Sequence, residues 1–274
     1  MKIAVTGGIG SVGKAVVEMA LAQGHSIVCI DRVTLDNDAR KPAITYIQAD
    51  ITDYTAMVNA FRGCNALVHM AAIPAPGHLP DHVVHNNNVV GSYNVLRAAV
   101  EVGIHKVCQA SSVNATGLAY SRWPRFDYFP LDEEHPTYNE DPYSLSKWIC
   151  EEQGNSLARR YEQMVISSMR FHWVVPDRAT AVRGYSKVEA PAKNLWAYTV
   201  HESAARACLL SLIADFKGHE VFYITAPNTA IDAPSLELKQ KYFPDVPVRG
   251  DLSGHKSFFS SGKAERLLGW KHDQ

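Results

Sequence analysis

The stretch Thr6-Gly7-Gly8-Ile9-Gly10-Ser11-Val12-Gly13 decides the fold. It follows an apolar run at residues 3–6 that is typical of a buried strand, and it leads into an amphipathic stretch at 12–23 that predicts a helix ending at Gly24. Glycines in such a turn let the backbone approach a phosphate closely, and the free N–H groups of the helix N-terminus attract anions. The pattern therefore predicts a dinucleotide-binding loop that consists of Gly7, Gly10, Ser11, Val12 and Gly13.

Further apolar runs alternate with amphipathic stretches through the first half of the chain, which is the pattern of βαβ units. The expected strands are residues 26–30, 44–49, 66–71 and 106–110. Two longer helices are expected at 81–102 and 143–161, and Thr52 is a candidate cap for a helix that ends near Gly63. The sequence predicts an α/β fold, a Rossmann-type doubly wound parallel sheet with a small C-terminal substrate-binding cap.

The order of these patterns suggests two regions. Residues 1–170 are expected to form the Rossmann domain, with core strands also contributed by about 195–226, and 171–274 to form mostly the cap. The segment 118–142 is rich in Pro, Tyr, Trp and acidic residues without periodicity, so we interpret it as a long ordered loop and a candidate lid. Loops are also expected at 177–191 and 227–234.

Composition narrows the possible partners and surroundings. The chain has 274 residues, 46% of them hydrophobic and 20% charged, with a net charge of -1, no apolar run of membrane-spanning length and no basic stripe. We therefore expect no membrane and no nucleic-acid partner. Because Met1 leads directly into a strand, the protein is predicted to be cytoplasmic. The five cysteines form no CxxC pair and are expected to be reduced core thiols, and no metal site is predicted.

Acidic residues follow two of the expected strands. Asp31 ends the second strand, where it can accept both hydroxyls of an adenosine ribose and repel the extra phosphate of NADP. Arg32 softens that preference, so we expect NAD, with NADP less favoured. Asp50 and Ile51 are placed to meet the adenine, although Asp50 is almost equally suited to capping a helix.

A second motif, Tyr143-Ser144-Leu145-Ser146-Lys147, points to chemistry. Residues four apart in a helix share one face, so the phenol and the ammonium lie one turn apart. A phenol titrates at about pH 10 in water, and a neighbouring ammonium together with a positive nicotinamide ring favours its phenolate. Tyr143 is therefore predicted to be a general acid/base that Lys147 assists.

Taken together, these motifs resemble those of an extended short-chain dehydrogenase/reductase of the NAD-dependent epimerase/dehydratase superfamily. The resemblance runs almost end to end, through Thr6 to Gly13, Asp31, Asp50-Ile51, His69-Met70-Ala71-Ala72, Asn87 to Gly91, Ser111-Ser112, Pro142 to Lys147, Met169-Arg170-Phe171, Val200-His201-Glu202, Lys263-Ala264 and Leu267 to Trp270.

The resemblance assigns roles to individual residues. It implies that Ser112 hydrogen-bonds the reacting oxygen, that Tyr143 transfers the proton, and that Lys147 binds the ribose and lowers the tyrosine pKa. It also implies that Ala71 and Ala72 line the cofactor groove, that Asn88 or Asn87 lies near the nicotinamide, and that His69 is a packed structural histidine. In relatives the two long helices pair with a second subunit, which implies a homodimer.

Departures from the family pattern bear on the substrate. Val113 and Asn114 follow Ser112 where dehydratases carry an Asp-Glu pair, and His172 stands where many nucleotide-sugar epimerases have Asn. The short C-terminal part favours a small substrate. In build the chain is most similar to uronate dehydrogenases, which hold a sugar carboxylate with a cap arginine, here Arg183 or Arg178.

The expected substrate site therefore consists of Ser112, Asn88, His172 and Arg183. The expected function is NAD-dependent hydride transfer at a secondary alcohol or carbonyl carbon of a sugar or sugar acid. Two alternatives stay open, namely a sugar epimerase that keeps its NAD bound and a non-catalytic NAD(H)-sensing regulator.

Overall fold

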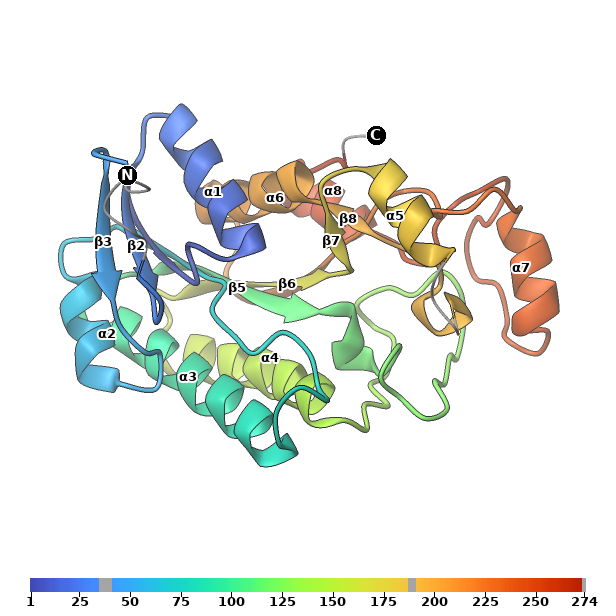
Figure 1. Ribbon diagram of the computed structural model, residues 1–274, viewed down its shortest axis with the longest axis horizontal. Coiled ribbons are helices and arrows are strands. Elements are labelled where there is room, and N and C mark those ends of the chain that lie inside the picture. The colour runs from blue at the N-terminus through green and yellow to red at the C-terminus, as the bar shows by residue number, and fades with distance from the viewer. Residues whose placement is uncertain (35–40, 187–190, 273–274) are drawn as a thin grey trace.

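A computed structural model describes residues 1–34, 41–186 and 191–272. Seven parallel strands form one sheet in the order β3-β2-β1-β4-β5-β6-β9 (Figure 1). These strands are β1 (Lys2–Thr6), β2 (Ser26–Asp31), β3 (Ile44–Gln48), β4 (Ala66–His69), β5 (Lys106–Ser112), β6 (Val165–Phe171) and β9 (Gly218–Ile224). The doubly wound α/β fold expected from the sequence is confirmed.

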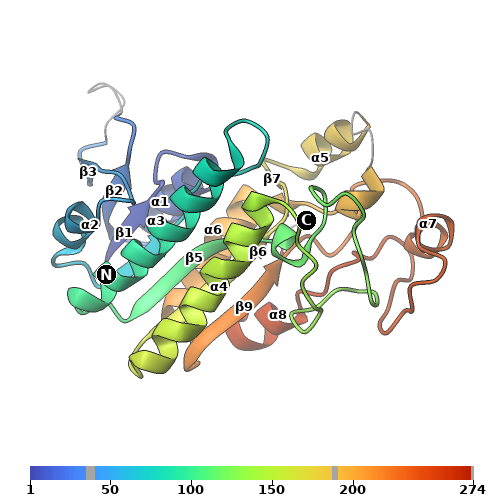
Figure 2. The same cartoon turned by 90° about the horizontal axis from the view of Figure 1, so that it is seen from below.

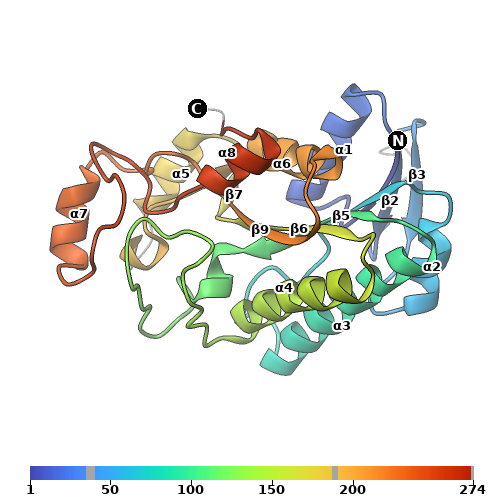
Figure 3. The ribbon, with the colours of Figure 1, turned by 180° about the vertical axis from the view of Figure 1, so that it is seen from behind.

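Helices cover both faces of this sheet (Figures 1 and 3). One face carries α1 (Ser11–Ala22), α6 (His201–Ile213) and α8 (Gly262–Leu268), and the other carries α2 (Tyr54–Phe61), α3 (Asp81–Glu101) and α4 (Pro142–Arg160). Strand β1 shows why, because Ile3 and Val5 pack on the first face and Ala4 on the second. Side chains of a strand alternate between the faces, so a fully apolar strand needs cover on both.

The strand order reverses between β1 and β4, which are neighbours in the sheet although β2 and β3 lie between them in the chain. Thr6 at the end of β1 pairs with Ile30 on one side and with His69 on the other. Open α/β sheets leave a crevice beyond the carboxyl ends of the strands at such a switch point. The fold therefore places the loops after β1, β2, β4 and β5 around one crevice.

Local capping explains where the helices begin and end. Helix α1 is followed by Gly24, which has a φ of 78° as a left-handed helix end requires. The prediction that Thr52 caps the second helix is wrong, because Asp53 caps α2 by accepting a hydrogen bond from the N–H of Ala56 at 2.9 Å. Helices α3 and α4 lie side by side on the second face of the sheet, which α2 also covers (Figure 2).

Besides the two apolar clusters on the faces of the sheet, a third cluster lies beyond the carboxyl ends of β5, β6 and β9 and forms the core of a cap. It gathers side chains from distant parts of the chain, including Phe129, Trp196, Tyr198 and Phe258. Its regular elements are β7 (Val174–Val175), α5 (Arg178–Tyr185), β8 (Thr199–Val200) and α7 (Ser235–Tyr242). The expected loop at 177–191 is therefore helical at α5, and its residues 187–190 lie outside the described part of the chain.

The segment 118–142 is part of this cap. Phe129 exchanges backbone hydrogen bonds with Pro247 and Arg249, at 2.9 and 2.7 Å, and the N–H of Leu131 donates to Phe258 at 2.7 Å. The segment is thus held by its backbone as an ordered loop, and its role as a lid stays a prediction. At the other end of the chain, α8 and Trp270 pack on the Rossmann core rather than in the cap.

All five cysteines are buried free thiols. Among the described residues, no helix is both long enough and apolar enough to cross a membrane.

Candidate active site

The first of two adjoining cavities is a groove of about 490 Å³ over the carboxyl ends of β1, β2 and β4. Its floor is the glycine loop, in which a side chain on Gly13 would place its Cβ 2.1 Å from the carbonyl oxygen of Gly7. A Cβ on Gly7, which has a φ of 68°, would lie 2.6 Å from the amide nitrogen of Ala71. Gly7, Gly10, Ser11, Val12 and Gly13 all line the groove. Glycine at positions 7 and 13 is thus required by close packing within the protein, and the loop that these glycines form lies at the N-terminus of α1, where free N–H groups suit a phosphate.

Charged and apolar residues stand together at the adenosine end of this groove. Asp31, Arg32, Asp50 and Ile51 line it. Asp31 also holds the glycine loop, since its carboxylate accepts from the N–H of Ile9 at 3.4 Å. Asp50 does not cap a helix, because Asp53 is the N-cap of α2; its carboxylate instead accepts from the N–H and hydroxyl of Thr52 at 2.8 and 2.7 Å. These hydrogen bonds lower the pKa of Asp50, so it stays an anion.

Of the two neighbouring asparagines Asn87 and Asn88, only Asn87 faces the groove. Ala71, Ala72 and Asn87 line the groove, whereas Asn88 lines neither cavity. Asn88 is 2% exposed and holds the chain after β4, accepting from the N–H of Ile73 at 2.8 Å and donating to the hydroxyl of Ser146 at 3.1 Å. It therefore ties this loop to α4 rather than facing a ligand.

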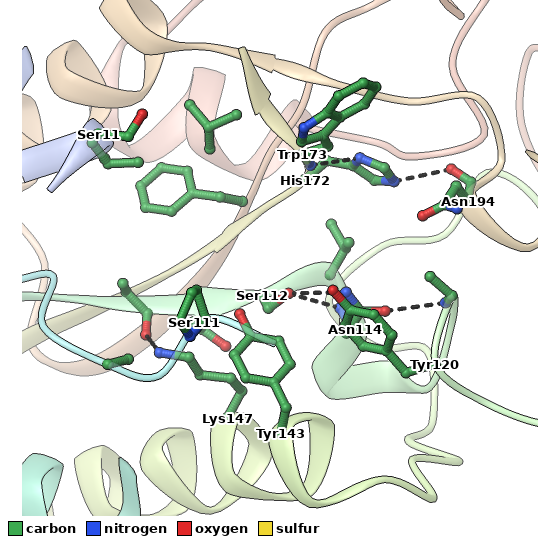
Figure 4. Close-up of a pocket in the computed structure, with 18 of the residues that line it drawn as sticks. Ser11, Ser111, Ser112, Asn114, Tyr120, Tyr143, Lys147, His172, Trp173 and Asn194 are labelled. Carbon is green, nitrogen blue, oxygen red and sulfur yellow. Dashed lines mark hydrogen bonds between the residues drawn. The ribbon is translucent and has the colours of Figure 1, made fainter. Parts of the chain in front are cut away.

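The second cavity, of about 480 Å³, continues from the groove and shares Ser11, Val12, Met70, Ala72 and Pro74 with it. It brings together the predicted catalytic residues Ser112, Tyr143 and Lys147 (Figure 4). Ser112 ends β5, and Tyr143 and Lys147 lie in the first two turns of α4. The two motifs lie far apart in the sequence but meet beyond the sheet edge.

The start of α4 fixes the position of Tyr143. Asp141 is the N-cap and accepts from the N–H of Tyr143 at 3.0 Å and of Ser144 at 2.9 Å, and Pro142 supplies a helical φ at the first position. The Tyr143 ring meets the ring of Tyr120 edge to face, with 5.8 Å between the ring centroids. The phenol is thereby held at the cavity wall with 8% of the residue exposed.

The electrostatics around Tyr143 differ from the prediction. Burial raises the pKa of its phenol, and the group that lowers this pKa is the hydroxyl of Ser112. The ammonium of Lys147 lies 5.9 Å from the centre of the Tyr143 ring and donates instead to the carbonyl of Ala110 at 2.8 Å. Burial lowers the pKa of Lys147 itself. The protein alone therefore holds Tyr143 as a neutral phenol.

Asn114 orients the hydroxyl of Ser112. Its backbone N–H donates to Ser112 Oγ at 3.1 Å and its side-chain amide at 3.4 Å, while its Oδ1 accepts from the N–H of Ala119 at 3.1 Å (Figure 4). Because two donors already point at Ser112 Oγ, its own proton is directed away from them. Ser112 is therefore arranged to donate to an oxygen in the cavity.

A buried ion pair supports the site from behind. Arg170 binds Glu151 with two hydrogen bonds of 2.8 Å, and the hydroxyl of Ser111 donates to the same carboxylate at 2.5 Å. The Glu151 carboxylate also raises the pKa of Lys147, one helical turn away, against the effect of burial. The ion pair thus connects β5, β6 and α4 directly behind the residues that face the cavity.

The cap supplies the opposite wall of the cavity, with His172, Trp173, Tyr185 and Asn194. His172 Nε2 donates to the backbone oxygen of Asn194 at 2.9 Å, and His172 Nδ1 accepts from the N–H of Trp173 at 2.7 Å. Burial lowers the pKa of His172 to about 4. His172 is therefore a neutral residue at this wall.

The two arginines proposed to hold a substrate carboxylate do not line the cavity. Arg183 donates to the hydroxyl of Thr180 at 3.0 Å on the exposed side of α5, and Arg178 reaches the backbone oxygen of Thr229 at 3.4 Å. For Arg183 the reason is the phase of the helix. Ala181 and Tyr185 form the buried face of α5, and residue 183 lies on the opposite side.

Sequence reasoning missed several residues of the cavity, chiefly Tyr120, Trp173, Tyr185 and Asn194. They belong to segments without periodicity, and they reach the cavity through the packing of the cap. The one available signal was Asn114, which stands out as a departure from the family pattern beside Ser112. His69 is buried as expected, in a hydrogen bond with the hydroxyl of Thr6 at 2.7 Å.

Curated relatives of this chain include both epimerases and dehydrogenases. It is 30% identical over 155 residues to a putative UDP-glucose 4-epimerase of Methanocaldococcus jannaschii, covering 55% of this chain and 48% of that protein. It is 29% identical over 180 residues to the L-arabinose 1-dehydrogenase (NAD(P)(+)) of Haloferax volcanii, covering 64% and 67% of the two chains. The matches thus span about half to two thirds of these relatives.

Solved structures show the same fold across the whole chain. The UDP-glucose 4-epimerase of Thermotoga maritima, crystallised with UDP-glucose, has a TM-score of 0.74 at 21% identity, covering 100% of this chain and 94% of that one. A mutated uronate dehydrogenase has a TM-score of 0.73 at 20% identity, covering 100% and 82%. The family model described as the NAD dependent epimerase/dehydratase family matches residues 3–190. The chain therefore belongs to this family of NAD-dependent enzymes, of the extended short-chain dehydrogenase/reductase type.

Proposed function

We propose that this protein is an NAD-dependent oxidoreductase that acts at a secondary alcohol or carbonyl carbon of a sugar or sugar acid. One observation carries the proposal. Ser112, Tyr143 and Lys147 face a cavity that is continuous with a groove suited to a dinucleotide. A tyrosine in the cavity that adjoins this groove can exchange a proton with a substrate oxygen while the carbon bonded to that oxygen faces the cofactor.

The residues of the groove fit NAD. The glycine loop lines the groove at the N-terminus of α1, whose free N–H groups suit a pyrophosphate, and Asp31 lines the end where an adenosine ribose would present its hydroxyls. We propose that Gly7, Gly10, Ser11, Val12, Gly13, Ala71 and Ala72 bind the cofactor together with Asp31, Arg32, Asp50 and Ile51. Asn87 replaces Asn88 in this proposal, because only Asn87 lines the groove. Bound NAD would supply the hydride acceptor, and NADP is the less favoured cofactor.

We propose a separate role in the reaction for each of Ser112, Tyr143 and Lys147. Ser112 donates to the reacting oxygen, because Asn114 occupies the other side of its hydroxyl. Tyr143 exchanges the proton with that oxygen. Lys147 is proposed to hold the nicotinamide ribose. Burial raises the pKa of Tyr143, and the positive charge of bound NAD would oppose that rise.

A sugar epimerase that retains its NAD is the second candidate, favoured by the 30% identity to the putative UDP-glucose 4-epimerase. Stoichiometric formation of NADH during turnover supports the dehydrogenase, whereas NAD that stays bound through purification and interconversion of sugars without net NADH supports the epimerase. A non-catalytic NAD(H)-sensing regulator does not require a serine hydroxyl and a buried tyrosine that face the same cavity, so it is the least favoured of the three candidates.

Three further proposals concern the whole protein. The cap, whose core includes Phe129, Trp196 and Phe258, is proposed to bind the substrate. A cytoplasmic homodimer is proposed, with α3 and α4 at the interface, because α3 exposes Val90 and Tyr93 beside α4. The partner is then a second copy of this chain.

Tyr143→Phe tests the catalytic assignment. It should lower kcat by at least about a hundredfold with little change in NAD affinity, because it removes the acid/base and leaves the groove intact. NADH formation followed by absorbance, and NAD binding followed by calorimetry, measure the two effects. A Phe variant that keeps most of its activity would refute the assignment.

A further inference from the structure

The charges around the second cavity bear on the substrate that it accepts. Of the described residues that line it, Lys147 alone has a charged side chain. Its ammonium donates to the carbonyl of Ala110 at 2.8 Å and lies beside Tyr143, so it belongs to the catalytic site. His172 supplies no positive charge, since it is buried and both of its ring nitrogens are hydrogen-bonded to neighbouring backbone.

The cap arginines are committed elsewhere. Arg183 is bound to Thr180 on the outer side of α5, and Arg178 to the backbone of Thr229. Apart from Lys147, no described residue that lines the cavity carries a positive charge that could pair with a carboxylate or a diphosphate, and a buried charge without a partner loses its solvation. The described wall therefore disfavours both uronates and nucleotide sugars.

The same wall offers a flat aromatic surface. Trp173 lines the cavity with 43% of the residue exposed, and its ring lies directly over Gly184, where a Cβ would come within 1.9 Å of the indole. Tyr185 meets the indole edge to face at 5.7 Å between centroids, which fixes its tilt. Gly184 therefore makes room for the indole. Asn114 and Asn194 line the same cavity, and their amides are uncharged hydrogen-bonding groups.

Aromatic faces with a few uncharged polar groups are the composition of sites for small neutral ligands. We infer that the substrate is an uncharged, polyhydroxylated small molecule of the free-sugar class, which packs one face on Trp173. This inference rests on the proposed function and narrows it, since that function admits sugar acids as well.

Matched pairs of substrates test the inference. Glucose against glucuronate, and galactose against galacturonate, differ only at one carbon, and UDP-glucose adds a diphosphate. With NAD present, kcat/KM for a neutral sugar should exceed that for its acid by at least about tenfold, because the acid leaves an unpaired charge in the cavity. Equal or better use of the acid, or a preference for UDP-glucose, would overturn the inference and leave the proposed function standing.

Calorimetry in the presence of NADH separates the two claims when no substrate is oxidised. Absence of turnover with every compound counts against the proposed function, and selective binding of the neutral sugar would still support the inference. Binding of the acid with equal affinity, or of no sugar at all, would overturn it.

Variants at the cap wall provide a second test. Trp173→Ala should raise KM for the neutral sugar at least about tenfold, because it removes the aromatic surface, and Trp173→Phe should restore most of the affinity. An Ala variant with unchanged KM would refute the role of the indole. Arg183→Ala should raise KM for neither member of a pair, and a selective loss of the acid would show that a cation does reach the cavity.

Discussion

Replacing Glu151 by Gln perturbs the ion pair behind the active site without a change in size. The carboxylate accepts from Arg170 Nε and Nη2, both at 2.8 Å, and from the hydroxyl of Ser111. A glutamine keeps one acceptor oxygen but turns an NH₂ group toward a donor of Arg170. The guanidinium, on a residue that is 5% exposed, then remains charged and is only half paired.

The structure sets the size of the expected effect. Removing one member of a buried ion pair costs about 3–5 kcal/mol, because the other charge stays buried without compensation. Domains have total stabilities of about 5–15 kcal/mol, and 1 kcal/mol corresponds to about 2–4 °C in Tm at this size. Glu151→Gln should therefore lower Tm by about 10 °C.

Thermal and urea denaturation followed by circular dichroism measure this loss. Glu220→Gln is the matched control, since Glu220 pairs with Lys263 at 2.6 Å where the two side chains are 32% and 22% exposed, and its loss should cost about 1 kcal/mol or less. Adding Arg170→Met to Glu151→Gln should recover part of the stability by removing the unpaired charge. Equal effects of the two Gln variants would refute this reasoning.

Three other predictions concern the groove, the proton and the assembly. Asp31→Ala should reduce the preference for NADH over NADPH by about tenfold, as seen in fluorescence titrations, because a charge-assisted acceptor and a repulsive charge are lost; a wild type that binds NADPH more tightly contradicts the role of Asp31. Ser112→Ala should shift the pH dependence of kcat/KM for oxidation to higher pH, because it removes the group that lowers the Tyr143 pKa; an unshifted profile excludes that coupling. Sedimentation should show a dimer at micromolar concentration, and Tyr93→Glu on the exposed face of α3 should weaken it; a wild type that sediments only as a monomer rejects the interface.

Much of the Rossmann half could be predicted from the sequence, because its signals are local. The glycine loop lies between an apolar strand and an amphipathic helix, and Tyr143 and Lys147 are spaced by about one helical turn. Strand β6 carried a weaker signal, since Ser167 and Ser168 interrupt its apolar run. Both are buried, and their hydroxyls bond to Ser211 and His219 across the packed layers, which sequence cannot anticipate.

The residues that line the second cavity could not be predicted from local sequence patterns in the same way. The position of Arg183 depends on the phase of α5, which Ala181 and Tyr185 set by packing into the cap. The lining by Trp173 depends on Gly184 eleven residues further along the chain, through a close contact that only the fold creates. Asn88 does not line the groove although Asn87 does, because its side chain is hydrogen-bonded to Ser146 on another helix. Each of these outcomes depends on contacts between distant segments.

The assembly of the cap from distant segments also imposes an order on biosynthesis. Every residue that lines the dinucleotide groove lies between positions 7 and 87, whereas the core of the cap closes only with Phe258 and Phe259. A ribosome makes the chain from its N-terminus at about 5–20 residues per second, and early segments can fold first. The groove can therefore take shape many seconds before the wall that selects the substrate. The nascent chain thus contains the residues of the dinucleotide groove before it contains those of the cap core.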